Sequence, residues 1–190
     1  MLRRLTVDDG ESSAVVQAVG FRTFEFVGSV GNNTARHGDH NASLWFKVNG
    51  QPLFSKGNNW MPSSVLTADD ALYKAMTVAR LEDEIAVGGN TIRVWGGGIY
   101  ETDTFYDTAD RLGLMILQDG SFFGSYPTLN QHESASSPAN LAYLSFQELV
   151  RTEIEYQARR LAFRPSLVLY SGNNESPDFA NLPLFVATQL

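Results

Sequence analysis

The feature that most constrains this chain is the alternation, from about residue 65 onward, of short apolar runs with longer amphipathic stretches. Apolar side chains at helical spacing predict helices over 67–90, 103–113 and 141–163. Four apolar runs predict strands, namely PLFSK (52–56), TIRVW (91–95), LMILQ (114–118) and SLVLY (166–170). Because nearly continuous apolar strands that alternate with helices are typical of a parallel sheet covered by helices, the sequence predicts an α/β fold.

Helix-end signals support these boundaries. Thr67 and Asp70 have the spacing of a capping box, and Gly88-Gly89 is expected to end that helix. Asp103 is the candidate N-cap of the next helix, and Gly113 is its expected terminator.

The opening of the chain has a different pattern. Residues 14–27 alternate apolar and polar side chains, which predicts one half-buried strand. Asn49-Gly50 separates two short apolar runs, and this dipeptide is the strongest local signal for a β-hairpin. We therefore expect antiparallel structure before the parallel sheet.

Composition excludes several classes of protein. The formal net charge is −7 and the 14 Lys and Arg residues are scattered, so we expect no nucleic-acid partner. No apolar run is long enough for a transmembrane helix, and the first residues lack the apolar core of a signal peptide, so we expect neither membrane insertion nor a leader in this chain. The absence of cysteine excludes disulfides and thiol catalysis.

One polar stretch carries two glycosylation sequons, Asn32-Asn33-Thr34 and Asn41-Ala42-Ser43, which favour a secreted or lysosomal protein. His37 and His40 could clamp a metal at i, i+3, but the surrounding Asn, Gly and Asp residues favour a solvated loop. We expect no metal and no cofactor.

Each predicted strand is followed by polar or aromatic residues. These are Gly57-Asn58-Asn59-Trp60, Gly96-Gly97-Gly98-Ile99-Tyr100, Asp119, and Gly172-Asn173-Asn174-Glu175. Active sites of barrels and of open α/β sheets lie at the C-terminal ends of the strands. The glycine triplet could cradle a phosphate, but the rest of a dinucleotide fingerprint is missing, which disfavours a nucleotide site.

The candidate site comprises aromatic, cationic, amide and carboxylate side chains at these strand ends. Its members are Trp60, Arg93, Trp95, Asp119, Asn174 and Glu175. Indole rings pack on the apolar faces of sugars, and amides and carboxylates bind sugar hydroxyls, so this mixture favours a carbohydrate.

Glycoside hydrolysis requires a carboxylic acid that protonates the leaving oxygen and a second carboxylate opposite it. Glu175 follows a buried strand, so we expect partial burial to raise its pKa and to make it the acid. Asn174 is expected to donate to a sugar hydroxyl, and Arg93 to keep a carboxylate ionised. The structural alternatives are that Arg93 only pairs with Asp119, that Trp60 or Trp95, each taken separately, is an ordinary core residue, and that Glu175 is a loop carboxylate.

The strings NGQPLFSKGNNWMPSS, NTIRVWGGGIYETDTFYDTADRLGLMILQD and RRLAFRPSLVLYSGNNE resemble the β-mannosidases of glycoside hydrolase family 2, over about residues 18–176. The resemblance implies a retaining exo-β-mannosidase with a (β/α)8 TIM barrel preceded by β-sandwich domains. Residues 1–48 would be the C-terminal part of an immunoglobulin-like β-sandwich domain, and residues 49–190 the N-terminal half of the barrel.

The same resemblance assigns roles within the candidate site. It makes Glu175, preceded by Asn174, the general acid/base, and it places Trp60, Arg93, Trp95 and Asp119 around the mannose of a β-mannoside glycan. Ser176-Pro177 and Gly120-Ser121 depart from the family pattern. The family's nucleophile, a glutamate on the seventh barrel strand, is absent from this chain.

We therefore interpret the chain as a β-mannosidase fragment that does not turn over substrate. No oligomeric state is predicted from the residues alone, but a half barrel has two unpaired sheet edges and is expected to be unstable or to self-associate. The alternatives are a family 2 glycosidase with another sugar specificity and a non-catalytic carbohydrate-binding module.

Overall fold

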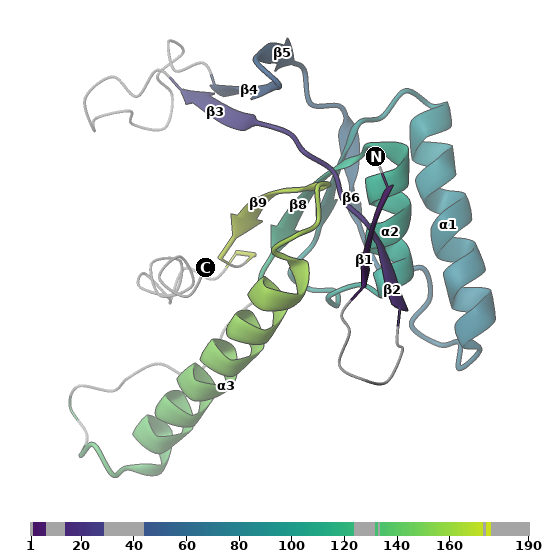
Figure 1. Cartoon of the computed structure of the whole chain (residues 1–190). Coiled ribbons are helices and arrows are strands. Elements are labelled where there is room, and N and C mark those ends of the chain that lie inside the picture. The colour runs from purple at the N-terminus through teal and green to yellow at the C-terminus, as the bar shows by residue number, and fades with distance from the viewer. Residues whose placement is uncertain are drawn as a thin grey trace.

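The computed structural model describes residues 2–6, 14–28, 44–123, 132, 134–172 and 174–175. Within these ranges the chain forms two small antiparallel sheets, one parallel sheet and the helices α1, α2 and α3 (Figure 1). His37, His40 and both sequons lie outside the described residues. In the described part of the chain, no helix has the length and apolar character needed to cross a membrane.

The antiparallel sheets come first along the chain. β1 (Leu2–Thr6) pairs with β2 (Ala14–Ala18), and β3 (Phe24–Gly28), β4 (Leu44–Val48) and β5 (Gln51–Leu53) form the second sheet in that order. The predicted hairpin is confirmed: Asn49 and Gly50 connect β4 to β5 with φ angles of 51° and 75°, the left-handed values that a two-residue turn requires.

The prediction of one continuous strand over 14–27 is wrong, because β2 and β3 belong to different sheets. The residues between them lie against the segment that precedes and begins β9. Arg22 donates hydrogen bonds to the carbonyl oxygens of Pro165 and Leu167. A side chain at Gly20 would place its Cβ 2.8 Å from Pro165 Cβ. These contacts interrupt the strand pattern.

The parallel sheet confirms the predicted α/β class. Its strands are β6 (Gly57–Trp60), β7 (Thr91–Val94), β8 (Met115–Asp119) and β9 (Leu167–Ser171), which pair in that order. The intervening connections contain α1 (Asp70–Ala86), α2 (Asp103–Leu112) and α3 (Pro138–Leu161). In Figure 1, α1 and α2 lie side by side, whereas much of α3 extends away from the sheet.

The first strand of this sheet lies later than predicted, at Gly57–Trp60 instead of 52–56. β6 is an edge strand that pairs only with β7 among the described residues, and only Trp60 of its four residues is buried, so it has no apolar run to reveal it. Gly57 permits this pairing, because a Cβ at this position would lie 1.5 Å from the carbonyl oxygen of Thr91.

The helix ends agree in part with the predictions. Gly113 ends α2 in the left-handed conformation, with φ of 73°, as predicted. The cap of α1, however, is Asp69, whose carboxylate accepts the Leu72 N–H at 3.0 Å, and not Thr67. Thr102 occupies the N-cap position of α2, and Asp103 is the first helical residue, where its carboxylate pairs with Arg160 instead of capping the helix.

A hydrophobic core lies between the parallel sheet and its helices. It includes Leu81, Ile92, Val94, Phe105 and Ile116, all buried. Side chains along a strand alternate between the two faces of a sheet. Ile92 and Val94 therefore point toward the helices, and the polar residues between them are left for the opposite face.

Candidate active site

Polar side chains gather on the sheet face opposite this core. The strand register places Asn59, Arg93 and Leu117 side by side across β6, β7 and β8, with Leu169 of β9 next to them. Asp119 follows on the same face, because it lies two positions beyond Leu117.

Arg93 connects the four strands of the sheet at this face. Its Nε and Nη2 donate to the two carboxylate oxygens of Asp119 at 3.2 and 2.6 Å. Nη2 also donates to Asn174 Oδ1 at 2.8 Å, and Nη1 donates to Asn59 Oδ1 at 3.2 Å. A lysine could not make this set of bonds, because only the planar guanidinium presents donors in a fixed fork.

The carboxylate of Asp119 is only 1% exposed. Burial raises the pKa of Asp119 above its usual range. Three residues oppose this shift: Arg93 through its hydrogen bonds and its charge, Gly96 through its N–H at 3.1 Å, and Ser171 through its hydroxyl. The pairing of Arg93 with Asp119, which the sequence analysis gave as a structural alternative, is thus present. The pair is compatible both with a structural ion pair and with a sugar-binding carboxylate.

Gly96 explains one part of the glycine triplet. A Cβ at this position would lie 2.7 Å from the Gly120 carbonyl oxygen, 2.8 Å from that of Phe122 and 3.2 Å from Asn174 Cβ. Glycine therefore allows the ends of three strands to converge. Because its amide already donates to Asp119, the Gly96 N–H serves the protein's own carboxylate and not a bound phosphate.

Asn174 and Glu175 lie just beyond β9. Asn174 is 5% exposed, its backbone N–H donates to Phe122 O at 3.0 Å, and it pairs with Phe123 in a parallel bridge. Glu175 is exposed and has φ of 49°, a left-handed conformation that is uncommon outside glycine. The prediction that Glu175 is partly buried is therefore wrong: the backbone turns after Asn174, and the Glu175 carboxylate makes no ion pair with another described residue.

Trp95 lies at the margin of this polar face. Its ring is half-buried and meets Phe123 edge-on, with ring centroids 5.2 Å apart. Since Phe123 pairs with Asn174, the Trp95 ring stands near the Asn174 end of the Arg93 network.

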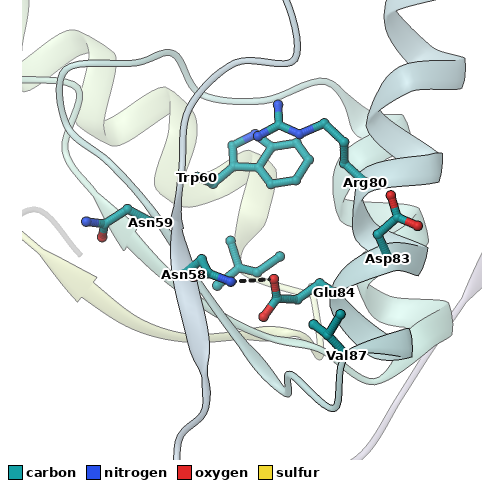
Figure 2. Close-up of a pocket in the computed structure, with 8 residues that line it drawn as sticks. Asn58, Asn59, Trp60, Arg80, Asp83, Glu84 and Val87 are labelled. Atoms are coloured by element: carbon teal, nitrogen blue, oxygen red, sulfur yellow. Dashed lines mark hydrogen bonds between the residues drawn. The ribbon is translucent and has the colours of Figure 1, made fainter.

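Trp60, in contrast, does not join the other predicted site residues. It is 4% exposed, its ring lies 4.9 Å from that of Phe105, and its Nε1–H donates to Glu101 Oε1 at 2.8 Å. Arg80 lies over the indole at 4.3 Å. Figure 2 shows Trp60 and Asn58 on one side of the β6 ribbon and Asn59 on the other. Trp60 is therefore a core residue on the helix side. It follows Asn59 directly in β6, and adjacent side chains of a strand point to opposite faces of the sheet.

Two open hollows flank β6. One, of about 340 Å³, lies between β6 and α1 on the helix side (Figure 2). The other, of about 390 Å³, is lined by Asn59, Thr91, Arg93 and Leu117 on the polar face. Asn59 is the site residue that the sequence analysis missed. A strand placed at 57–60 would have revealed it, since alternation then sets Asn59 opposite Trp60.

The geometry can bind a polar ligand through one guanidinium, one carboxylate and two amides. No group of three His, Cys, Asp or Glu side chains suited to a metal occurs in the described ranges.

A scan of known protein families found no model that matches this chain. Curated relatives, however, cover most of it. The β-mannosidase of Rattus norvegicus is 41% identical over 140 residues, which is 73% of this chain and 14% of the relative. The β-mannosidase of Mus musculus is 37% identical over 175 residues, 90% of this chain and 17% of the relative. β-Mannosidase B of Aspergillus fumigatus is 35% identical over 176 residues, with 90% and 18% covered. The chain thus spans less than a fifth of the length of these relatives.

Solved structures give a matching result. The β-D-mannosidase from Dictyoglomus thermophilum is similar with a TM-score of 0.68 and 26% identity, over 100% of this chain and 23% of that chain. The exo-chitosanase of Amycolatopsis orientalis shares the fold with a TM-score of 0.63 and 20% identity, over 93% of this chain and 19% of that chain.

Proposed function

The chain is homologous to a segment of the β-mannosidases of glycoside hydrolase family 2, and from this relationship we propose that it forms part of an enzyme that hydrolyses terminal β-D-mannose residues. The observation that carries the proposal is the Arg93 network. Its hydrogen bonds gather Asp119, Asn174 and Asn59 at the C-terminal ends of parallel strands, within a segment related to β-mannosidases.

The fold proposal is that β6 to β9 are the first four strands of a (β/α)8 barrel and that the antiparallel strands before them are the end of an immunoglobulin-like β-sandwich domain. The parallel order of β6 to β9 and the polar groups at their C-terminal ends support a barrel half. We place the junction after Leu53 and not at residue 48, because β5 still pairs with β4.

In this proposal Glu175 is the general acid/base. It would protonate the glycosidic oxygen as the bond to the leaving group breaks, and later accept a proton from the attacking water. Arg93, Asp119 and Asn174 would bind mannose hydroxyls, and Trp95 would pack on the apolar face of the sugar ring. The nucleophilic carboxylate of a retaining mechanism would come from outside this chain. Trp60 supports the strand from the helix side and has no place in the sugar pocket.

Binding of 4-nitrophenyl β-D-mannoside to the ¹⁵N-labelled chain tests the proposal. We expect the resonances of Gly96, Trp95 and the Arg93 side chain to shift with the mannoside and to shift less with the galactoside and glucuronide analogues. Arg93→Met should weaken binding by about tenfold or more, because it removes the donor that orients Asp119 and Asn174. Equal shifts with all three glycosides, or shifts that avoid these residues, would contradict a mannose site.

A turnover assay addresses the missing nucleophile. The chain alone should not release 4-nitrophenol from the mannoside. Sustained release that disappears in Glu175→Gln would show that both carboxylates are present in these 190 residues.

The exposed carboxylate of Glu175 favours one alternative, a non-catalytic carbohydrate-binding role. Mannoside binding that is unchanged in Glu175→Ala, with no turnover in any assembly of the chain, would support it.

A further inference from the structure

We propose that Gln118 and Tyr106, which lie on the helix side of the sheet, are positioning residues that orient Asp119 toward Arg93. The inference rests on the proposed function in one respect, namely that Asp119 belongs to the sugar-binding site.

Gln118 reaches Asp119 through the backbone. Its side chain is fully buried, and its Nε2 donates to the carbonyl oxygen of Asp119 at 2.8 Å. Its Oε1 accepts the hydroxyl of Tyr106 at 2.7 Å. Tyr106 comes from α2 and is also fully buried. Because the Asp119 carbonyl oxygen can only accept, it requires Gln118 Nε2, and the Tyr106 hydroxyl holds the other end of the amide by donating to Oε1.

The peptide that follows Asp119 is held at both of its polar groups. Gln118 binds its carbonyl oxygen, and its N–H, which belongs to Gly120, donates to Ser171 O at 2.8 Å. Gly120 leaves no room for a side chain, since a Cβ would lie 2.6 Å from the Gly172 carbonyl oxygen. With this peptide fixed, the Asp119 carboxylate is directed to Arg93 and to the Gly96 N–H.

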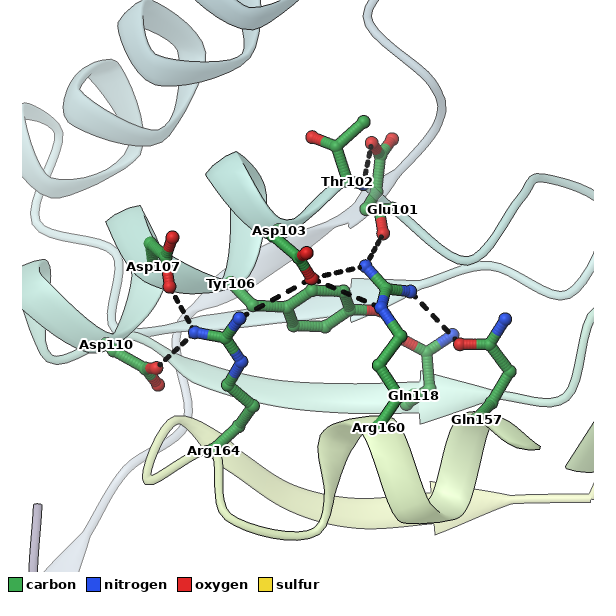
Figure 3. A network of polar contacts seen from close by, with 10 residues as sticks. All are labelled: Glu101, Thr102, Asp103, Tyr106, Asp107, Asp110, Gln118, Gln157, Arg160 and Arg164. Atoms are coloured by element: carbon green, nitrogen blue, oxygen red, sulfur yellow. Dashed lines mark hydrogen bonds and ion pairs between the residues drawn. The ribbon is translucent and has the colours of Figure 1, made fainter. Parts of the chain in front are cut away.

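Tyr106 is itself held by Arg160 of α3 and by Arg164, three residues after the end of that helix (Figure 3). The guanidinium groups of Arg160 and Arg164 lie over its ring, at 5.5 and 6.0 Å from the centroid. Burial raises the pKa of Tyr106, so its hydroxyl remains a hydrogen-bond donor over the whole physiological range. The geometry thus connects the contact between α2 and α3 to the orientation of a carboxylate on the far side of the sheet.

A purely structural role is the competing explanation, because buried polar pairs also contribute to stability. The two explanations differ in what happens at Asp119. A positioning role requires the hydrogen bond between Gly96 and Asp119, and the titration of Asp119, to change when Tyr106 loses its hydroxyl, even if the fold survives.

The test compares Tyr106→Phe with Tyr170→Phe by NMR of the full chain. Tyr170 is a suitable control, because its hydroxyl is buried on the same face and has no hydrogen-bond partner among the described residues. In Tyr106→Phe we expect the Gly96 amide resonance to move, its hydrogen exchange to accelerate about fivefold or more, and the Asp119 carboxyl to titrate at a changed pH. Tyr170→Phe should leave all three readouts at their wild-type values.

Gln118→Met, which keeps the length of the side chain but removes the amide, should reproduce the effects of Tyr106→Phe. If either variant lowers the unfolding midpoint but leaves the Gly96 amide and the Asp119 titration unchanged, the residues are structural and the proposal is overturned. These readouts need no sugar. A wild-type chain that binds no mannoside would therefore count against the proposed function, while the NMR comparison would still decide on positioning.

Discussion

Arg93 is the residue on which the polar face depends, because one guanidinium contacts groups from the other three strand ends. It is one-third exposed at the side chain, whereas its partner Asp119 is almost fully buried. Removal of Arg93 would leave a buried carboxylate without its cation, and the loss of a single partner is the most damaging change to such a pair.

We therefore predict that Arg93→Met lowers the free energy of unfolding by about 3 kcal/mol at neutral pH. The loss should shrink in acid. Burial raises the pKa of Asp119 in the folded state above its value in the unfolded chain. Below the unfolded-state pKa the carboxyl is protonated in both states, and its burial costs no stability. As the pH rises through the folded-state pKa, the buried carboxylate ionises and the protein loses stability. Urea denaturation at a series of pH values measures the difference, and a loss that does not depend on pH would contradict this explanation.

For Trp60 we predict an effect on stability and none on sugar binding. Trp60→Phe removes the donor to the buried Glu101 carboxylate and part of a core side chain, and should cost about 2 kcal/mol. Trp95→Phe, at the margin of the polar face, is the matched control and should weaken mannoside binding with a smaller loss of stability. Mannoside titrations of both variants provide the measurement. Weaker binding by Trp60→Phe and unchanged binding by Trp95→Phe would contradict the prediction and place Trp60 in the sugar site.

The difference between the two tryptophans shows what could be predicted at the residue scale. Arg93 and Asp119 lie in strands whose apolar runs the sequence displays, so their place and their pairing could be predicted. Trp60 and Asn59 lie in an exposed edge strand without such a run. The predicted strand ended at residue 56, so neither residue could be assigned to a face of the sheet. The exposure of Glu175 follows from a left-handed backbone that no local pattern predicts.

At the scale of elements, the contact between α2 and α3 depends on ion pairs (Figure 3). Arg164 is 9% exposed at its side chain and pairs with Asp107 and with Asp110, which is 8% exposed. Arg160 pairs with Asp103 at 2.8 Å and also donates to the carbonyl oxygen of Glu101. These contacts fix the end of α3, and the residues that directly follow it, against α2.

Arg164→Met is predicted to cost about 3 kcal/mol, because it leaves the Asp110 carboxylate buried and unpaired by a cation. Arg111→Met is the control, because Arg111 lies in α2 next to Asp110. It breaks the pair with Glu82, in which both side chains are more than half exposed, and should cost less than about 1 kcal/mol. Thermal unfolding of the two variants provides the comparison, and equal losses would show that burial does not decide the strength of these pairs.

Element types were easier to predict than element boundaries. The three helices, the hairpin and three of the four parallel strands are confirmed, because each has an apolar period or a turn dipeptide of its own. The caps of α1 and α2 differ from the predictions, since several Asp and Thr residues near each start could serve. The break between β2 and β3 depends on contacts with residues far along the chain.

At the scale of the whole molecule, the parallel sheet has two open edges in the described part of the chain, β6 and β9. Large apolar side chains are also exposed before α1, among them Phe54 at 81% and Leu66 at 92%. Unpaired strand edges and exposed apolar surface both promote association between chains.

We predict that the 190-residue chain self-associates at micromolar concentration. Asn58→Lys should reduce the association, because a charged side chain on an edge strand disfavours further pairing. Light scattering coupled to gel filtration measures the molar mass of both proteins. A monodisperse monomer of the unmodified chain would contradict the prediction.

The alternation of faces along β7 has a consequence for how such a segment can evolve. Ile92 and Val94 pack in the core, while Arg93 between them binds the polar groups of the opposite face. Consecutive codons of one strand are thus under separate selective pressures: a substitution at position 92 or 94 acts through the core, and one at position 93 acts through the ion pair of the polar face.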